Sequence, residues 1–442
     1  MKPDAPASDD GVFSAVPPPG EELRRPYIPA RLGAVLLIAV IAIVFALAFL
    51  LLDGYLSHQI WTEGVLVANR WMIPVLVVGF SLVVGLSRRY LRAPSAIDAG
   101  FVEMVRGDAE PPDYRQFPGA FISSLASLLS GASIGPEGVL GVLVSEIAEF
   151  LRPRLRVPLS DAAGFNLAAL ASAFNGLVGG VLFTGIFATE LQSGRAKTPL
   201  QFLVWNLIAG AVGFVVFRAF GFPSFAGMIP FPPAGLTPAF AVVAILCGVL
   251  ATGITIGIGA WLQVVEKTLD RFFGERVVLR VLAAGAVIGA VCFVFPDLLF
   301  SGEEQIHDFI VQPAVYGAGL LLLLAVLKIV LFGVSIKAGY IGGPVFPIIF
   351  ACTLIGLALN LLVPGIPAGV FVLCIEAGAL AVAMGIPLTS VLLVALVSGA
   401  DQDMIVLLVV SIATAMLLSA EAMKRVEARR VIAESGAAAG TR

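Results

Sequence analysis

The sequence predicts an all-α protein that crosses a membrane many times. The chain has 442 residues, of which 59% are hydrophobic, and its mean hydropathy is +1.00. Charged residues make up 13% of the chain, against roughly a quarter in soluble domains. Long apolar stretches recur from end to end, and in lipid only helices and closed barrels satisfy every backbone hydrogen bond. These observations exclude a soluble globular protein.

The first 29 residues differ in composition from everything that follows. They are rich in Pro, Ala, Asp and Glu, and they lack the basic and apolar regions of a signal peptide. We therefore expect residues 1–29 to form a disordered cytoplasmic tail. The first apolar run, residues 33–52, is long enough to span a bilayer.

One membrane domain is expected over residues 30–434. A Pro-rich stretch, residues 220–237, divides it into halves of roughly 30–232 and 238–434. The last predicted helix covers residues 404–434 and becomes charged from Glu421 onward. A short tail is expected over 435–442, with no C-terminal regulatory domain.

Basic residues predict the orientation of the chain, because cytoplasmic loops carry an excess of Lys and Arg. Such clusters lie at 24–31, 88–92, 267–280 and 424–430, whereas residues 53–71 hold a single Arg and suit an outer loop. Both termini are therefore expected in the cytoplasm of a multi-pass protein of the cell (inner) membrane. The net charge of −3 gives no reason to expect a nucleic-acid partner.

Two Gly/Pro-rich breaks interrupt the apolar sequence, one in each half. They are Gly131-Ala-Ser-Ile-Gly-Pro-Glu-Gly138 and Gly339-Tyr-Ile-Gly-Gly-Pro-Val-Phe-Pro347. Broken helices within a membrane are tolerated only where the freed backbone is buried in protein or lines a cavity. Matched breaks in two halves are typical of a mid-membrane binding site in an inverted-repeat transporter.

The first break combines a helix start with a carboxylate. Gly135 and Gly138 allow a sharp turn and close approach to backbone N–H groups, and Pro136 suits the first helical position. The following helix begins with free N–H groups and a partial positive charge, which favour an anion. Glu137 can itself occupy such a site when ionised and vacate it when protonated, so we expect it to act as gate and pH sensor. The alternative is that Glu137 merely caps its own helix.

The second break also places a helix start after a Gly/Pro turn, but it holds no carboxylate. Gly343 and Pro344 precede an apolar helix, and the N–H groups of Val345 and Phe346 are expected to point toward an ion. Pro344 has no N–H to contribute. The alternative is a tight turn between two core helices.

The motifs resemble those of the CLC family of chloride channels and chloride/proton antiporters, as a divergent prokaryotic member. Residues 135–139 match the family's loop that holds a gating glutamate, and residues 343–347 resemble its later loop, with the phenylalanine displaced by one position. Residues 94–98 are similar to its serine-bearing loop. Residues 173–183 and 386–389 also follow the family pattern.

The resemblance implies a fold of about 18 helices in two inverted halves, with the broken helices meeting at mid-membrane. It also implies a homodimer in a lipid bilayer, with one anion pathway per subunit. Glu137 would occupy an outer anion position. The residues implied around the anion are Ser95, Gly135, Pro136, Gly138, Gly343, Val345 and Phe346.

The chain departs from proton-coupled family members at the inner proton position. The corresponding residues are Ile186 or Phe187, neither of which carries a proton. Glu190, three residues beyond Phe187 and near the same helix face, is one candidate relay, and a surface acid is the alternative. Glu376 is a second intramembrane acid and a further candidate. Asp401 is expected to face solvent.

We therefore predict transport of chloride or a similar monovalent anion, with a channel slightly favoured over a proton-coupled antiporter for chloride, fluoride or nitrate. A membrane-embedded enzyme is a minor alternative, because no dyad of reactive residues appears. No cofactor or metal is expected: His58 and His307 are far apart, and Cys247, Cys292, Cys352 and Cys374 lack metal-ligand spacing.

Overall fold

The computed structural model describes residues 28–65, 69–94, 113–191, 200–222 and 224–439. These residues hold 15 α-helices and no β-strand, where the resemblance implied about 18 helices for the complete fold. The predicted tail over 1–29 lies almost wholly outside the described residues. Ser95 lies outside them too.

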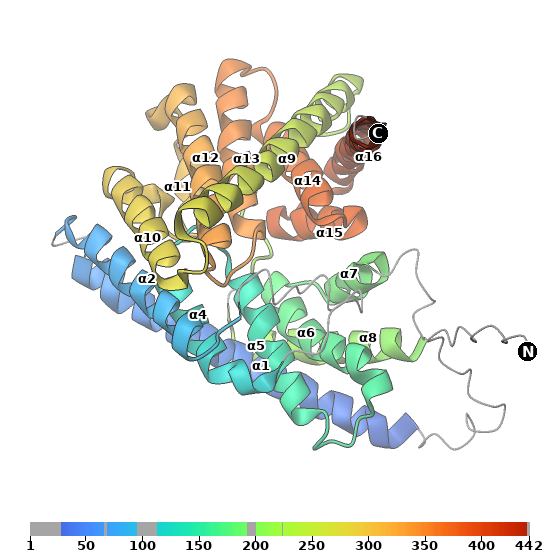
Figure 1. The fold of residues 1–442 in the computed structure, drawn as a ribbon. Helices are drawn as coiled ribbons and strands as arrows, with labels where there is room; N and C mark the ends of the chain where they lie inside the picture. Colours follow the sequence, from blue (N-terminus) through green and yellow to red (C-terminus); the bar gives the residue numbers. More distant parts are fainter. Residues whose placement is uncertain (1–27, 66–68, 95–112, 192–199, 223, 440–442) are drawn as a thin grey trace, which may run out of the picture.

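The first half contains seven of the described α-helices (Figure 1), which are α1 (Ile28–Ser57), α2 (Met72–Tyr90), α4 (Phe117–Leu129), α5 (Pro136–Leu151), α6 (Ala162–Val178), α7 (Phe183–Leu191) and α8 (Leu200–Ala219). Short helical turns accompany them: η2 (His58–Val65), η3 (Tyr114–Gln116) and η4 (Leu159–Asp161). α5 and α7 are too short to cross a bilayer by themselves, as a half-spanning helix would be.

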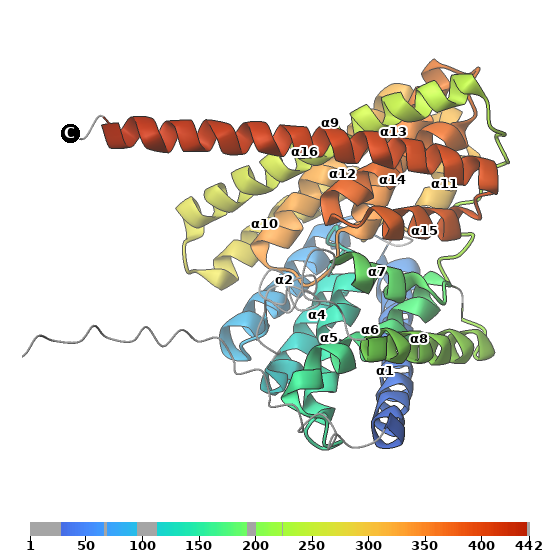
Figure 2. The same ribbon diagram turned by 90° about the vertical axis from the view of Figure 1, so that its right-hand side faces the viewer.

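The second half contains the other eight, which are α9 (Pro238–Phe273), α10 (Val277–Val294), α11 (Ile306–Val311), α12 (Pro313–Ala338), α13 (Val345–Leu362), α14 (Ala368–Met384), α15 (Pro387–Ser398) and α16 (Gln402–Ala439). The turn η5 (Pro296–Leu298) follows α10. In Figures 1 and 2 the helices of the first half (blue to green) lie together below those of the second half (yellow to red).

Eight of the described helices are long and apolar enough to cross a membrane. Many large apolar side chains on these helices are exposed at the molecular surface, which suits helices whose outer faces meet lipid tails. The prediction of a polytopic all-α protein is confirmed. The last helix differs from its predicted bounds, because α16 continues to Ala439 and extends beyond the rest of the molecule (Figure 2).

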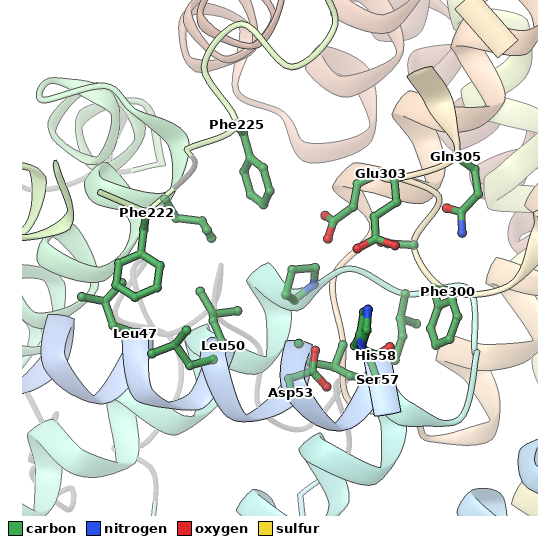
Figure 3. A pocket seen from close by; sticks show the side chains of 18 of the residues that line it. Leu47, Leu50, Asp53, Ser57, His58, Phe222, Phe225, Phe300, Glu303 and Gln305 are labelled. Carbon is green, nitrogen blue, oxygen red and sulfur yellow. The ribbon is translucent and has the colours of Figure 1, made fainter. Parts of the chain in front are cut away.

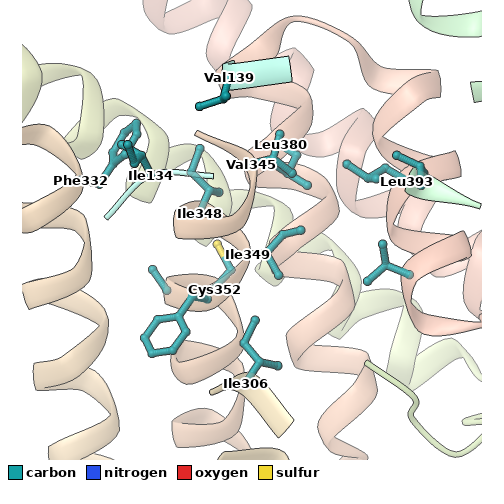
Figure 4. Close-up of a cluster of buried hydrophobic side chains, with 14 of the residues drawn as sticks. Ile134, Val139, Ile306, Phe332, Val345, Ile348, Ile349, Cys352, Leu380 and Leu393 are labelled. Carbon is teal, nitrogen blue, oxygen red and sulfur yellow. The ribbon is translucent and has the colours of Figure 1, made fainter. Parts of the chain in front are cut away.

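The core lies where the two halves meet. Ile134 and Val139 from the first break pack among side chains of α13 and its neighbours, including Val345, Ile348 and Ile349 (Figure 4). All of these side chains are buried. Close packing holds the two breaks in a rigid surround, and buried serine hydroxyls bond their backbones, Ser335 Oγ accepting from Ser133 N–H at 3.2 Å and Ser127 Oγ from Ile341 N–H at 3.1 Å.

Basic side chains gather at one end of α10. Arg280, near the start of that helix, donates to the carbonyl of Lys337 and pairs with Asp270 at 2.6 Å. Arg88 donates to the carbonyl of Ala338 in the same region. The other end of α10 leads through η5 into residues 299–305, so the basic cluster and this loop lie at opposite ends of one membrane-length helix.

The Pro-rich segment between the halves does more than connect them. Phe225 N–H donates to Leu177 O, whereas Gly227 and Ile229 donate to Leu396 and Val397. This segment therefore ties α6 of the first half to α15 of the second. The composition of this Pro-rich segment predicts only a boundary between the two halves, not these hydrogen bonds.

Candidate functional site

The two breaks meet and pair through their backbones. Gly135 N–H donates to Gly343 O at 2.9 Å, and Gly343 N–H donates to Gly135 O at 2.8 Å. These two bonds form an isolated antiparallel bridge between segments more than 200 residues apart in sequence. The expectation that the breaks lie together is confirmed.

Glycine is required at this crossing for steric reasons. A Cβ added at Gly138 would lie 2.3 Å from the carbonyl carbon of Gly342, and one added at Gly342 would lie 2.5 Å from Cβ of Ile134. Gly135 is the N-cap of α5 in extended conformation, and Pro136 occupies the first turn as expected. The Gly/Pro composition thus lets two helix starts approach to backbone contact.

Glu137 reaches across to the other break. Its Oε1 accepts a hydrogen bond from Val345 N–H, the first residue of α13, at 2.8 Å. The backbone N–H groups of Phe346 and of Glu137 itself also interact with this carboxylate. The acid therefore binds the start of the helix from the opposite half, rather than only capping its own.

The second carboxylate oxygen of Glu137 is in a different situation. Oε2 is buried and has no hydrogen-bond partner among the described residues. A Cβ at Gly343 would come within 2.2 Å of Oε1, and one at Gly135 within 1.9 Å of Oε2. The two glycines therefore form a cradle shaped to hold an anionic group against free N–H donors.

A cavity of about 610 Å³ adjoins the first break, and we call it the vestibule. Pro136 and Ile134 of the first break form part of its wall, and Phe222 and Phe225 of the segment between the halves form another part (Figure 3). Phe225 packs edge-on against Phe346, with ring centroids 4.4 Å apart. The vestibule thus leads to the residues around Glu137.

Acidic groups line the vestibule. Asp53 comes from α1, and Glu303 and Glu304 come from the loop after η5. Burial, and the negative charges of Glu137, Glu304 and Asp53, raise the pKa of Glu303, which Lys328 lowers in part. A raised carboxyl pKa means that the proton is held near neutral pH.

Lys328 fixes the loop that carries Glu303. Its ammonium is fully buried, donates to the carbonyls of Leu298 (3.2 Å) and Phe300 (2.6 Å), and lies 4.7 Å above the ring of Phe350. Phe300 has a φ of 61°, a conformation that residues with a Cβ rarely adopt. Two carbonyls held by one buried cation stabilise this turn.

Glu190 makes a second contact between an acid and a helix start. Oε1 accepts from Leu388 N–H, and Oε2 accepts from both N–H and Oγ1 of Thr389, the first of these at 2.7 Å. Both oxygens are therefore engaged at the start of α15. The structure does not bring Glu190 to the crossing of the breaks.

The remaining predicted acids lie apart from the crossing as well. Glu376 is buried in α14 and accepts a hydrogen bond from Thr353 Oγ1 at 2.7 Å. Asp401 is exposed and caps α16 by accepting from Met404 N–H, which fits the expectation that it faces solvent. The four cysteines are free thiols and buried, as expected.

Sequence reasoning missed the vestibule acids and Lys328. Lys328 stands in the middle of an apolar run, and an intramembrane cation is itself a functional signal. Glu303 and Glu304 belong to a polar loop, and they become a candidate site only because they line one cavity with Asp53, some 250 residues earlier in the chain. No local sequence pattern contains that arrangement.

Comparison with known proteins identifies the family. The profile described as "Voltage gated chloride channel" matches residues 79–420, most of the chain. The chain belongs to this family. Among curated relatives of this CLC protein is the "Putative ion-transport protein YfeO" of Escherichia coli (strain SMS-3-5 / SECEC), 25% identical over 311 residues, which cover 69% of this chain and 71% of the relative. The protein of the same name from Shigella boydii serotype 4 is 26% identical over 310 residues, with the same coverage.

Solved CLC structures share the fold. A slow cyanobacterial Cl⁻/H⁺ antiporter matches with a TM-score of 0.75 and 15% identity, covering 89% of this chain and 95% of that one. A CLC-type fluoride/proton antiporter matches with a TM-score of 0.69 and 19% identity, covering 88% and 94%. These likenesses establish the CLC fold for this chain.

Proposed function

We propose that this CLC protein carries chloride or a similar monovalent anion across the membrane along a path that Glu137 closes. The observation that carries the proposal is the hydrogen bond from Val345 N–H to Glu137 Oε1. A carboxylate occupies there the position that a permeant anion would take. Family membership supports anion transport in general.

The gating mechanism follows from competition for one set of donors. When ionised, Glu137 satisfies the helix start of α13, an interaction worth up to about 2 kcal/mol in partly buried sites. Protonation removes the charge that holds the side chain there and frees the N–H groups of Val345 and Phe346. The anion then replaces the carboxylate, with Gly135, Pro136, Gly138 and Gly343 forming the close-fitting backbone around it.

Amide dipoles suit a transport site better than a full positive charge. They offset part of the dehydration cost of the anion without binding it too tightly to leave. Ser95, which lies outside the described residues, would supply a hydroxyl donor deeper in the path. The neutral donor set is the reason to favour a monovalent anion.

We favour passive permeation over coupled exchange. The inner proton position is taken by Ile186 or Phe187, neither of which carries a proton, and both carboxylate oxygens of Glu190 are bound at the start of α15. Neither group is placed to deliver protons from the inside. The buried pair of Glu376 and Thr353 supports the second candidate, a proton-coupled antiporter.

The chain would act in the cell membrane, with the basic end of α10 inside and the vestibule outside, as the distribution of Lys and Arg favours. A homodimer with one pathway per subunit is proposed from the family resemblance. A transporter rather than an enzyme fits the family.

Anion efflux from proteoliposomes tests the proposal. Chloride efflux from vesicles containing the wild-type protein should rise as the pH falls, because protonation displaces Glu137. Glu137→Gln should transport at a rate that does not depend on pH. Efflux that depends on pH identically in both proteins would contradict the gating role.

The same vesicles separate the two candidates. An outward chloride gradient is imposed at equal pH on both sides, and the internal pH is followed with a trapped dye. A channel leaves the internal pH unchanged once the membrane potential is clamped with potassium and valinomycin. Proton movement driven uphill by chloride would establish the antiporter instead.

A further inference from the structure

Helices α2 and α10 pack against each other in antiparallel directions (Figure 1). A Cβ added at Gly85 would lie 3.0 Å from Cα of Val278, and one added at Gly289 would lie 2.9 Å from Cα of Pro74. This register places the end of α2 beside the start of α10. The arginines that follow Gly85 and those that precede Val278 therefore gather at one end of the helix pair.

Two arginines at this end are bound to the protein itself. Arg88 donates to the carbonyl of Ala338. Arg280 donates to the carbonyl of Lys337 and pairs with Asp270 at 2.6 Å. The two carbonyls belong to the last residues of α12, directly before the second break. These contacts fasten the ends of α2 and α10 to α12 and neutralise the carboxylate of Asp270.

Three further arginines at the same end are exposed, namely Arg89, Arg92 and Arg276. Within the part of the chain that the structure describes, their side chains form no ion pair and no hydrogen bond. Arg92 has a φ of 54°, so an arginine stands where a glycine would be less strained. Arg271, at the end of α9, is a fourth exposed arginine, and the neighbouring acid Glu275 offsets one of the four charges.

An exposed apolar surface adjoins the arginines on each helix. On α2, Leu82 and Leu86 are exposed and share a helix face with Arg89, at positions i, i+4 and i+7. On α10, the exposed Leu279 lies three residues from Arg276, on the same face. A molecule bound at this end therefore meets positive charge first and hydrocarbon surface next.

An anionic phospholipid has this order of groups. Tyr90 and Phe272 are exposed next to the arginines, as aromatic side chains are at a membrane interface. The planar fork of a guanidinium group matches phosphate oxygens in a way that a lysine ammonium does not. Basic clusters at the end of a membrane helix attract anionic lipids. An acidic protein segment would match the charge, but it would leave the apolar faces unused.

We propose that the shared end of α2 and α10 binds the phosphate headgroup of an anionic phospholipid, with the acyl chains along the exposed leucines. Arg89 and Arg92 from α2 and Arg276 from α10 hold the headgroup between the two helices. The bound lipid joins helix ends that Arg88 and Arg280 fasten to α12, so it stabilises the side of the second break from which α12 arrives. Binding of this lipid does not depend on gating by Glu137.

Thermal unfolding in detergent with added lipid tests the site. Dioleoylphosphatidylglycerol should raise the unfolding midpoint of the wild-type protein by several degrees, because a ligand of the folded state stabilises it. Dioleoylphosphatidylcholine has the same acyl chains and no net charge, and it should raise the midpoint much less. Arg89→Gln/Arg276→Gln should unfold as wild type without lipid, since both side chains are exposed. It should need about tenfold more of the anionic lipid for the same rise.

Two further variants separate this site from general charge attraction. Lys424→Gln/Arg425→Gln removes two exposed charges from α16 and should respond to phosphatidylglycerol as wild type does. Arg89→Lys/Arg276→Lys keeps the charge without the guanidinium fork, so its response should fall between those of wild type and the glutamine pair. Equal responses to the two lipids, or an equal loss in the α16 pair, would overturn the proposal. Equal stabilisation by inorganic phosphate at the same concentration would replace the lipid site with a site for free phosphate.

Discussion

Two glutamates of the first half bind helix starts of the second half, and they do so differently. Glu137 meets the start of α13 through Oε1 and leaves the other oxygen, Oε2, buried without a hydrogen-bond partner among the described residues. Glu190 meets the start of α15 through both oxygens and adds the hydroxyl of Thr389. The two contacts use the same helix-start chemistry.

From this difference in hydrogen bonding we expect Glu137 to leave its helix start and Glu190 to stay bound. Glu190 loses three hydrogen bonds if it leaves, and Leu388 and Thr389 are then uncapped. Glu137 is bound by backbone N–H groups alone and keeps one oxygen, Oε2, without a hydrogen-bond partner among the described residues, so protonation there weakens its hold on the helix start. The proposed gating thus depends on incomplete bonding of the carboxylate at its helix start.

The largest effect is expected from Glu137→Ala. In the wild type, the protonated fraction of Glu137 falls about tenfold per pH unit above its pKa, so efflux should fall in the same proportion. The alanine variant should lose this dependence and, well above the wild-type midpoint, transport at least about tenfold faster than wild type. Glu190→Ala, measured beside it as the matched control, should keep the wild-type profile. A lost pH response in Glu190→Ala would erase the distinction between the two acids.

Gly343→Ala should reproduce much of this effect without touching the acid. The new Cβ would lie 2.2 Å from Glu137 Oε1, the end of a flexible side chain that can turn away. We expect folded protein with weakened pH dependence, at a stability cost of about 1–3 kcal/mol for overpacking.

Gly138→Ala is the counterpart of that experiment. Its Cβ would strike the backbone of Gly342, which cannot turn away. We expect loss of folded protein, read as the monodisperse fraction in size-exclusion chromatography. A well-folded Gly138→Ala protein would show that the two breaks are further apart in solution than this structure has them.

Glu190→Gln should affect stability rather than transport. Replacing the carboxylate weakens charge-assisted hydrogen bonds to the start of α15, each worth about 1.5–3 kcal/mol. The thermal unfolding midpoint in detergent should fall by several degrees, whereas Glu421→Gln on the exposed face of α16 should change it little. The pH profile of efflux should match wild type in both variants.

The smallest effect is expected from Glu376→Gln. This side chain is buried and bonded to Thr353, away from the crossing of the breaks, and a glutamine can keep that bond. Chloride efflux should remain within about twofold of wild type, and no uphill proton movement should be seen in either protein. Uphill proton movement by the wild type that Glu376→Gln abolishes would identify a relay and favour the antiporter.

Most of the fold was predictable because membrane helices can be recognised from the local sequence alone. Apolar runs and Gly/Pro breaks gave the all-α class and both breaks, and their pairing could be expected because freed backbone in a membrane must be buried. The bonding of Glu190 could not be read in this way. It depends on α7 and α15 being neighbours in space, and the sequence pattern gave only a family position and an acid close to it.

The vestibule escaped prediction for a similar reason. Asp53 and Glu303 are acceptable loop or helix-end residues in isolation, and they become a charged cavity only after α1 and the loop beyond α10 meet. Phe225 also looked like part of a boundary segment, although it packs on Phe346 at the start of α13. Lys328 was the exception, because a lysine in an apolar run is visible in the sequence alone.

The most direct test is to locate bromide by its anomalous scattering in crystals of the Glu137→Gln protein. Our account predicts bromide at the position of the wild-type carboxylate, within hydrogen-bond reach of Val345 N–H and Phe346 N–H. It also predicts that the wild-type protein at high pH excludes bromide from this position. Bromide bound away from the start of α13 in the variant, or equally at that start in both proteins, would contradict the claim that Glu137 and the anion compete for one site.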